Sequence, residues 1–260
     1  TVHTVHTVHT VHTVHTVHHV PLLSCKVLKI GYGKVMSNDV FIIIPCYNEQ
    51  AVLRETVSGL LPLNARVVLV DDGSTVPVRK VVDGLPVEIL RHPINLGQGA
   101  ALQTGMDYAL QKGARAVIHF DADGQHQADD IPRFLEALEQ GADVVLGSRF
   151  LRPEDSSTLP PRKRMLLQGA RLVNLIFTGL WLSDAHNGFR ALNQRALKAI
   201  RLQENRMAHA SEILGQIRQA RLKVVEIPTR ISYTEYSVRK GQKLSNSLNI
   251  LLDLLLRKLL

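Results

Sequence analysis

The amino-acid sequence predicts an α/β fold in which a mostly parallel central sheet is covered by helices on both faces. Short apolar runs of strand length alternate with segments of helical length, and this order favours right-handed crossovers between parallel strands. The apolar runs are continuous rather than alternating, which is typical of strands buried on both faces. A chain of 260 residues with 45% hydrophobic and 21% charged residues has the composition of a folded protein.

The predicted strands are the apolar runs, and the predicted helices are the longer segments between and after them. In chain order the strands are Val40–Pro45, Arg66–Val70, Val87–Leu90, Ala116–Phe120, Asp143–Leu146 and Lys223–Ile227. The helices are Glu49–Leu61, Gly99–Gln111, Ile131–Glu139, Lys163–Leu182, Gln194–Ile200, Ala210–Arg221 and Leu244–Leu260. The last of these is leucine-rich, but it is too short and too charged to span a bilayer. We therefore expect protein or lipid to cover it.

The N-terminal part has a different pattern. Residues 1–19 repeat Thr-Val-His, and a period of three matches neither the helix nor the strand. We interpret them as a low-complexity extension, residues 20–38 as a connector, and residues 39–260 as a single domain. The start of the chain does not resemble a signal peptide, and two cysteines cannot build a disulfide framework. These features favour a cytoplasmic protein.

The net charge of +8 is unevenly distributed. Up to Leu159 the chain has 13 Lys and Arg against 17 Asp and Glu, and from Pro160 it has 18 against 6. The first part could hold a metal with its carboxylates, and the second could hold an anion: the phosphates of a nucleotide, a membrane surface or a nucleic acid. Aromatic residues make up only 5% of the chain and do not interleave with the basic positions, so nucleic acid is disfavoured.

Polar clusters follow three of the predicted strands. They are Tyr47-Asn48-Glu49, Asp71-Asp72 and the pair Asp121 and Asp123. Ligands of open parallel sheets bind beyond the carboxyl ends of the strands. We therefore expect the functional site at this edge.

Asp121 and Asp123 lie two residues apart where a strand opens into a loop, so they can share one divalent cation. Hard cations such as Mg²⁺ or Mn²⁺ prefer oxygen ligands, and Gln125 offers a third one. Asp129 and Asp130 are better placed to cap the helix that begins at Ile131, which leaves the first pair without an obvious structural role.

The turn at Asp71–Ser74 allows two interpretations: ordinary turn chemistry, or a carboxylate that accepts hydrogen bonds from a ribose or a base. Gly97 and Gly99 precede a helix, where backbone N–H groups can approach a phosphate. The complete dinucleotide fingerprint and the P-loop are both absent.

Together these segments resemble the ordered motifs of family 2 glycosyltransferases, and most of all the dolichol-phosphate mannose synthase branch. The motifs are Ile44–Glu49, Val70–Thr75, Asn95–Gly99, Asp121–His126, Gly147–Phe150 and Asn187–Arg190. The resemblance spans about Val40 to Ser245. It implies a GT-A fold with one catalytic domain, a nucleotide-sugar donor and inversion at the anomeric carbon.

The resemblance also implies roles for individual residues. The nucleotide-binding residues would be Pro45, Tyr47, Asn48, Glu49, Asp72, Gly97 and Asp121. The metal ligands would be Asp121, Asp123 and Gln125, with Mg²⁺ or Mn²⁺ as the cofactor. Arg149 would meet a donor or acceptor phosphate, and Arg239 and Lys243 resemble a late basic segment of the family.

The acceptor decides whether the reaction needs a base. A hydroxyl acceptor requires a carboxylate, and Asp184 and Glu212 are the candidates. A lipid phosphate is already anionic and needs cations instead, for which Arg149, Arg162, Arg164 and Arg190 are available. We expect Asp123, Arg149 and Asp184 to be catalytic and a polyprenyl phosphate to be the acceptor. Transfer to a sugar hydroxyl of a cell-surface glycan, and nucleotide-sugar binding without turnover, remain alternatives.

The acceptor prediction also locates the protein. The basic second part and the apolar stretch Leu172–Leu182 suit a peripheral position on the inner face of the membrane. A homo-oligomer is left open.

Overall fold

The computed structural model describes residues 38–151, 171, 175, 178–185, 187–206 and 208–230. The strands are β1 (Val40–Cys46), β2 (Arg66–Asp71), β3 (Glu88–Arg91), β4 (Ala116–His119), β5 (Val144–Ser148), β6 (Arg190–Asn193) and β7 (Val224–Pro228). The helices are α1 (Leu53–Leu60), α2 (Val78–Val81), α3 (Gln98–Gln111), α4 (Ile131–Glu139), α7 (Gln194–Ala199) and α8 (His209–Gln219). Short 3₁₀ turns lie at Leu61–Leu63 and Ala128–Asp130.

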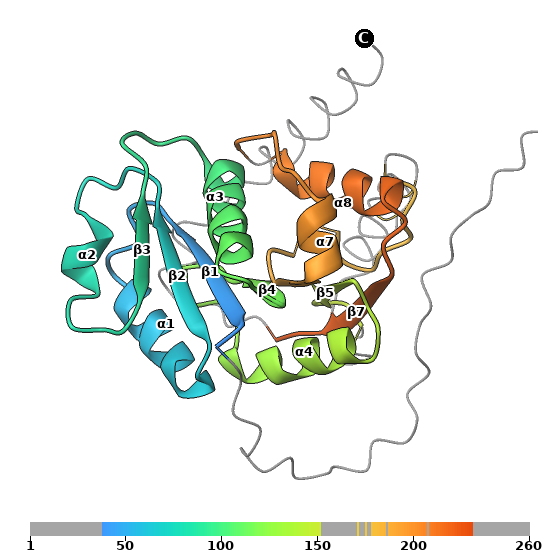
Figure 1. The fold of residues 1–260 in the computed structure, drawn as a ribbon, viewed down its shortest axis with the longest axis horizontal. Coiled ribbons are helices and arrows are strands. Elements are labelled where there is room, and N and C mark those ends of the chain that lie inside the picture. The colour runs from blue at the N-terminus through green and yellow to red at the C-terminus, as the bar shows by residue number, and fades with distance from the viewer. Residues whose placement is uncertain are drawn as a thin grey trace, which may run out of the picture.

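The strands form one seven-stranded sheet in the order β3-β2-β1-β4-β6-β5-β7 (Figure 1). The pairs β1–β2, β1–β4, β2–β3 and β5–β7 are parallel. The predicted mostly parallel α/β sheet is therefore confirmed.

Alternate residues of the central strand supply two separate cores. Phe41 and Ile43 of β1 face a cluster that includes residues of α3, α7 and α8. Val40, Ile42 and Ile44 face a second cluster built with α1 and α4. Because successive side chains of a strand point to opposite faces, a continuous apolar run fills both cores at once. Figure 1 shows the two helical layers on either side of the sheet.

Strand β6, like the four-residue helix α2, is an element that the sequence did not predict. It lies antiparallel between β4 and β5, pairing Ile118 with Ala191 and Val145 with Ala191. It has only four residues, begins with a charged arginine and ends with a polar asparagine. Its local pattern is too short to indicate a strand, and its pairing depends on two strands that lie far away in the sequence.

The predicted helix Lys163–Leu182 is wrong at its C-terminal end. Gly179 has a φ of +69°, and its N–H donates to the carbonyl of Leu175 at 2.7 Å, which is a helix-ending geometry. Leu180 and Leu182 continue without helix and are buried, whereas Trp181 is 37% exposed. The predicted helix Leu244–Leu260, the Thr-Val-His repeat and nearly all of the connector lie outside the described residues.

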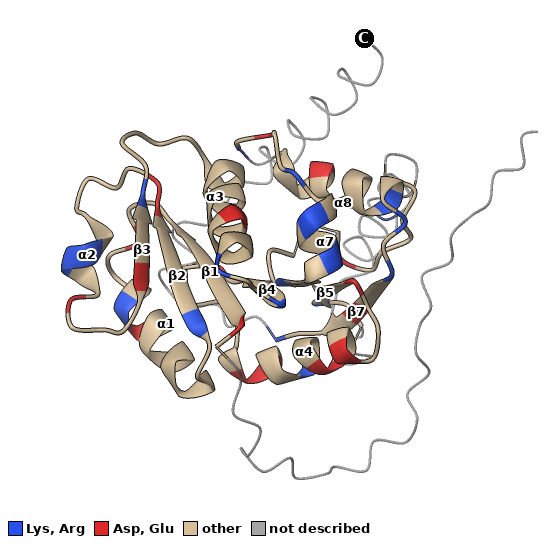
Figure 2. Cartoon of the chain, viewed as in Figure 1, with Lys and Arg blue, Asp and Glu red and all other residues tan. Residues whose placement is uncertain are grey.

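Basic side chains are present on α7 and near the end of α8, at Arg195, Lys198 and Arg218, whereas acidic ones gather along α4 (Figure 2).

Within the described part of the chain, no helix combines the length and the apolar character that crossing a membrane requires.

Candidate functional site

The polar clusters meet at the carboxyl edge of β2, β1 and β4, which are neighbours in the sheet. Asn48, after β1, takes a left-handed backbone conformation with a φ of +57°, which asparagine tolerates better than most residues. Its N–H donates to Ser74 Oγ at 3.1 Å, and its side-chain oxygen accepts from the N–H of Thr75 at 2.9 Å. The loops after β1 and β2 are thus joined. Tyr47 beside them is 46% exposed.

Asp121 follows β4 and is oriented by two side chains. Its carboxylate contacts His126 Nε2 at 2.9 Å and accepts from Gln98 Nε2 at 3.2 Å. Burial would raise its pKa, but the His126 hydrogen bond and nearby positive charge hold that pKa below its ordinary value. His126 packs against Phe120 and Phe189, with ring centroids at 5.5 and 5.0 Å. Although neighbours surround Asp121, 29% of its side-chain surface remains exposed.

Asp123 lies in a different environment from Asp121. One of its oxygens accepts from the N–H of Gln125 at 3.0 Å. Burial, and then the negative charge of Asp121, raise the pKa of Asp123. A divalent cation would relieve this repulsion, and an all-oxygen donor set fits Mg²⁺ or Mn²⁺. Among the described residues, no three His, Cys, Asp or Glu side chains gather as a metal site. Asp121, Asp123 and Gln125 could supply oxygen ligands to such an ion, as the sequence analysis expects.

The helix-capping prediction is not supported for Asp130. This residue directly precedes α4, but its side chain makes no capping hydrogen bond to that helix within the described part of the chain. One Asp130 oxygen instead accepts from Arg133 at 3.3 Å, and the other accepts from the N–H of Arg230 at 3.4 Å.

Asp72 is an internal anchor of the loop that follows β3. Its carboxylate accepts from the N–H groups of Leu96 and Gly97 at 2.9 and 2.7 Å, and it contacts His92 Nδ1 at 2.7 Å. The other ring nitrogen of His92 reaches Thr104 Oγ1 at 2.9 Å. This buried carboxylate therefore holds the loop 92–97 against α3.

The start of α3 is occupied by the protein's own backbone. The N–H groups of Gly99 and Ala100 donate to the carbonyl of Asn205 at 2.8 and 3.4 Å. A β-carbon on Gly97 would lie 2.2 Å from that same carbonyl oxygen. The two glycines thus allow close packing of the segment 204–206, and the N–H groups that were expected to approach a phosphate are engaged within the protein.

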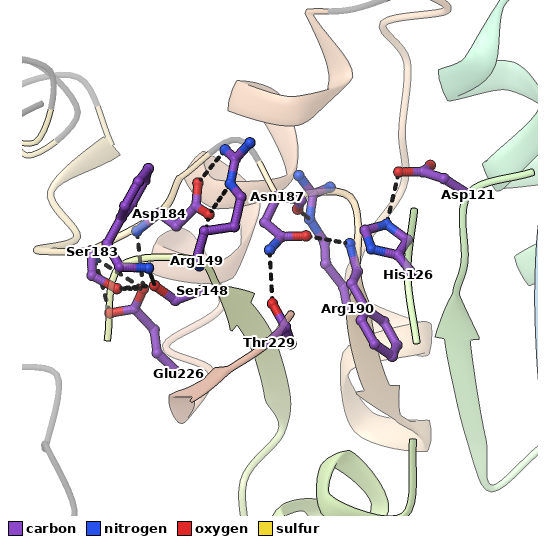
Figure 3. A network of polar contacts seen from close by, with 12 residues as sticks. Asp121, His126, Ser148, Arg149, Ser183, Asp184, Asn187, Arg190, Glu226 and Thr229 are labelled. Carbon is purple, nitrogen blue, oxygen red and sulfur yellow. Dashed lines mark hydrogen bonds and ion pairs between the residues drawn. The ribbon is translucent and has the colours of Figure 1, made fainter. Parts of the chain in front are cut away.

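A second polar network contains Arg149 and Asp184 (Figure 3). Asp184 Oδ2 accepts from Arg149 Nε at 2.6 Å and from its backbone N–H at 3.1 Å, while Oδ1 accepts from Nη2 at 2.8 Å. Ser148 Oγ lies 2.6 Å from Ser183 Oγ, and both serines are buried. Asp184 is therefore engaged through both oxygens.

Arg190, the first residue of β6, is 2% exposed. Its Nε donates to the carbonyl of Asn187 at 3.1 Å. Burial lowers its pKa to about 10, opposed by the negative charges of Asp121 and Asp184, so the side chain remains a cation at neutral pH. The sequence identified this arginine, but only the structure shows that its charge interacts with both aspartates.

Two buried histidines were missed by the sequence reasoning. Burial, and then the charge of Arg190, lower the pKa of His119 to about 3 and that of His209 to about 4. Neither ring nitrogen of His119 has a hydrogen-bond partner among the residues that the structure describes. The sequence did hold one indication that His119 is buried, because this residue lies inside an apolar run that forms a buried strand. Both side chains are neutral at pH 7, which leaves Arg190 as the cation of this cluster.

The other predicted residues have different surroundings. Glu212, the alternative base, accepts from the N–H groups of Gln203 and Glu204 at 2.9 Å each, so it holds the loop before α8. Pro45 lies within β1, and the carbonyl of Glu49 accepts from the N–H of Leu53 at the start of α1. Arg162, Arg164, Arg239 and Lys243 lie outside the described residues.

Known proteins resemble this chain in sequence and in fold. Residues 41–201 match the model of glycosyl transferase family 2. The UDP-N-acetylglucosamine–dolichyl-phosphate N-acetylglucosaminyltransferase of Methanococcus voltae is 30% identical over 85% of this chain and 96% of its own length. The dolichol-phosphate mannosyltransferase of Pyrococcus furiosus is 30% identical over 73% of this chain and 55% of its own.

The fold has a solved counterpart in the glucosyl-3-phosphoglycerate synthase of Mycobacterium tuberculosis, crystallised with Mn²⁺, UDP-glucose and phosphoglyceric acid. The two share a TM-score of 0.56 and 12% identity over 83% of this chain and 77% of the other, a similarity of fold alone. The GT-A fold and the resemblance to the dolichol-phosphate branch are thereby confirmed. The chain therefore belongs to glycosyl transferase family 2.

Proposed function

We propose that this protein transfers a sugar from a nucleotide-sugar donor to a polyprenyl phosphate at a membrane surface, with inversion at the anomeric carbon. The observation that carries the choice of acceptor is the Arg149–Asp184 pair. A carboxylate with both oxygens in an ion pair is poorly suited to remove a proton, and a phosphate acceptor needs no such base. The names of the Methanococcus and Pyrococcus relatives, which specify dolichyl or dolichol phosphate, support the same acceptor class.

The chemistry of this transfer balances without a protein base. A phosphate monoester has its second pKa near 6 and is largely dianionic at neutral pH. One of its oxygens attacks the anomeric carbon from the face opposite the diphosphate. The new carbon–oxygen bond forms as the bond to the diphosphate breaks, and the electron pair leaves with the nucleoside diphosphate. Attack from the opposite face inverts the configuration.

The leaving diphosphate gains negative charge, so the site must supply positive charge there. Asp121, Asp123 and Gln125 would hold Mg²⁺ or Mn²⁺, and this ion, when bound, neutralises the departing phosphates. His126 and Gln98 orient Asp121 for that role. The Arg190 side chain, which stays protonated at neutral pH, adds a positive charge that interacts with Asp121. A related fold that was crystallised with Mn²⁺ and a nucleotide sugar supports this assignment.

The remaining residues divide between donor and acceptor. We assign Pro45, Tyr47, Asn48 and Glu49 to the nucleotide, because they follow β1 at the same edge as Asp121. Asp72 and Gly97 support that site by fixing the loop 92–97. Arg149, whose side chain is 35% exposed, is assigned to the acceptor phosphate.

A surface feature supports contact with a membrane. Trp181 is exposed, and the guanidinium of Arg171 lies 5.1 Å from its ring centroid. Tryptophan and arginine combine an apolar body with a polar end, which suits the boundary between lipid and water. Arg162, Arg164, Arg239 and Lys243 would add positive charge toward anionic lipid. We therefore propose a peripheral position on the inner face of the membrane.

The test uses the full chain with labelled nucleotide sugars, vesicles that carry a polyprenyl phosphate, and Mg²⁺ or Mn²⁺. We expect label to enter the organic phase and binding to vesicles to require anionic lipid and weaken with salt. Arg149→Ala should reduce transfer more than nucleotide binding. Arg115→Ala is the matched control, because Arg115 also pairs with an aspartate, Asp39 at 3.1 Å, but precedes β4 at the opposite edge.

Two outcomes would refute the proposal. Transfer of label to a water-soluble glycan and not to lipid would mean a hydroxyl acceptor. Nucleotide-sugar binding without any release of nucleoside diphosphate would mean a binding protein without turnover.

A further inference from the structure

Glu226 lies on β7, outside every motif that the sequence analysis identified, yet it joins the Arg149 network. Its carboxylate accepts from the N–H of Ser183 at 2.9 and 3.0 Å, from Ser183 Oγ at 2.7 Å, and from the N–H of Asp184 at 3.2 Å. A carboxylate that accepts several backbone N–H groups fixes the turn that supplies them. Glu226 therefore sets the position of residues 183 and 184.

The turn at residues 183 and 184 also orients Arg149. Asp184 uses both oxygens on one side of the Arg149 guanidinium, the side formed by Nε and Nη2. Such a two-point contact fixes the plane of the guanidinium and hence the direction of its opposite edge, at Nη1. Ser148 reinforces the arrangement, because its Oγ contacts Ser183 Oγ at 2.6 Å and accepts from the N–H of Phe150 at 3.1 Å. Figure 3 shows the chain of contacts from Glu226 to Arg149.

We propose that Glu226 is a positioning residue that acts through Asp184 to aim Arg149 at the acceptor phosphate. This assignment rests on the proposed function, because it takes Arg149 as the group that binds the phosphate. It also gives Asp184 a positioning role in place of the role of a base. The pairing of the strands supports the positioning role. Strand β5, which leads into Arg149, is paired in parallel with β7, and Leu146 is aligned with Glu226.

A merely structural carboxylate is available for comparison. Glu88 lies on β3 at the other edge of the same sheet, and it too is a partly buried acceptor that pairs with Arg66 and Tyr108. Glu88→Gln is therefore the matched control for Glu226→Gln. Both substitutions remove one negative charge from an edge strand, but only one of them touches the Arg149 network.

The experiment measures KM for a polyprenyl phosphate in vesicles and Kd for the nucleotide. Hydrogen bonds to a charged group are stronger than neutral ones even when partly buried, so we expect Glu226→Gln to raise the acceptor KM about tenfold. The nucleotide Kd should stay unchanged, and Glu88→Gln should alter neither value. The double variant Glu226→Gln/Arg149→Ala should be no worse than Arg149→Ala alone, because a residue that acts through Arg149 has no effect without it. Additive losses would overturn the proposal.

A second readout does not depend on the acceptor. The Nε–H signal of Arg149, assigned by its absence in Arg149→Lys, should be slow to exchange in the wild type and fast in Glu226→Gln. Ser183→Ala, which removes the hydroxyl contacts to Glu226 and to Ser148, replaces Glu226→Gln if that variant does not fold. An unchanged Arg149 signal in either variant would refute the positioning role. Absence of any transfer to lipid phosphate by the wild type would instead refute the proposed function.

Discussion

Replacing Gly188 with alanine would place a β-carbon 2.4 Å from Asp121 Oδ2 and 3.0 Å from its Oδ1. Real β-carbons do not approach an oxygen so closely, so Asp121 would have to move. Its carboxylate is held by His126 at 2.9 Å and by Gln98 at 3.2 Å, and moving it breaks or lengthens both contacts. Gly188 therefore allows Asp121 to occupy its observed position.

The size of the effect follows from those contacts. A hydrogen bond to a charged group contributes about 1.5–3 kcal/mol, and the low end applies because Asp121 is partly exposed. We expect Gly188→Ala to lower the free energy of unfolding by about 1.5 kcal/mol. The displaced carboxylate would also hold its ligand less well in the transition state, and we expect at least about a tenfold loss of nucleoside diphosphate release, which corresponds to about 1.4 kcal/mol of activation free energy.

Urea unfolding and a coupled assay of nucleoside diphosphate release measure the two effects. Gly215→Ala is the control, because a β-carbon there meets no atom within 4 Å and the residue lies inside α8. Alanine in a helix interior should raise stability by about 0.5–1 kcal/mol and leave turnover unchanged. Normal turnover of Gly188→Ala would refute the reasoning, because it would mean that the position of Asp121 does not matter.

Three further predictions concern the metal, the buried histidines and the N-terminal repeat. Asp123→Asn, or EDTA, should remove most turnover while the unfolding midpoint in urea changes little; a metal-independent rate would contradict the assignment. An unfolded histidine titrates near 6.5 but His119 near 3, so the unfolded chain binds more protons and stability should fall as the pH drops from about 6.5 towards 3. The urea midpoint of His119→Leu should decline less over that interval, and an identical decline would exclude His119 as a cause. Deleting residues 1–19 should leave the melting temperature and the rate close to those of the full chain, because their period of three cannot pack; a large loss of either would show that the repeat contacts the enzyme.

Local pattern was enough to predict most of the sheet and the edge at which the polar clusters of the candidate site meet. Continuous apolar runs such as Val40–Pro45 indicate buried strands because both faces of each run must be covered, and β1 indeed contributes to both cores. Asn48, Asp72 and Asp121 each follow or end such a run, so parallel pairing brings them to one edge without further information.

Tertiary structure decided which partner each polar group takes, because those partners lie far apart in the sequence and meet only when the strands are ordered. The sequence could not show that Asn205 occupies the N–H groups at the start of α3, or that Asp184 pairs with Arg149. Nor could it show Glu226, which reaches Ser183 only because β7 lies beside β5 at the sheet edge. Apolar periodicity is a property of neighbouring residues and can be detected in the sequence. A hydrogen bond between distant residues depends instead on the strand order and on the insertion of the short β6 between β4 and β5.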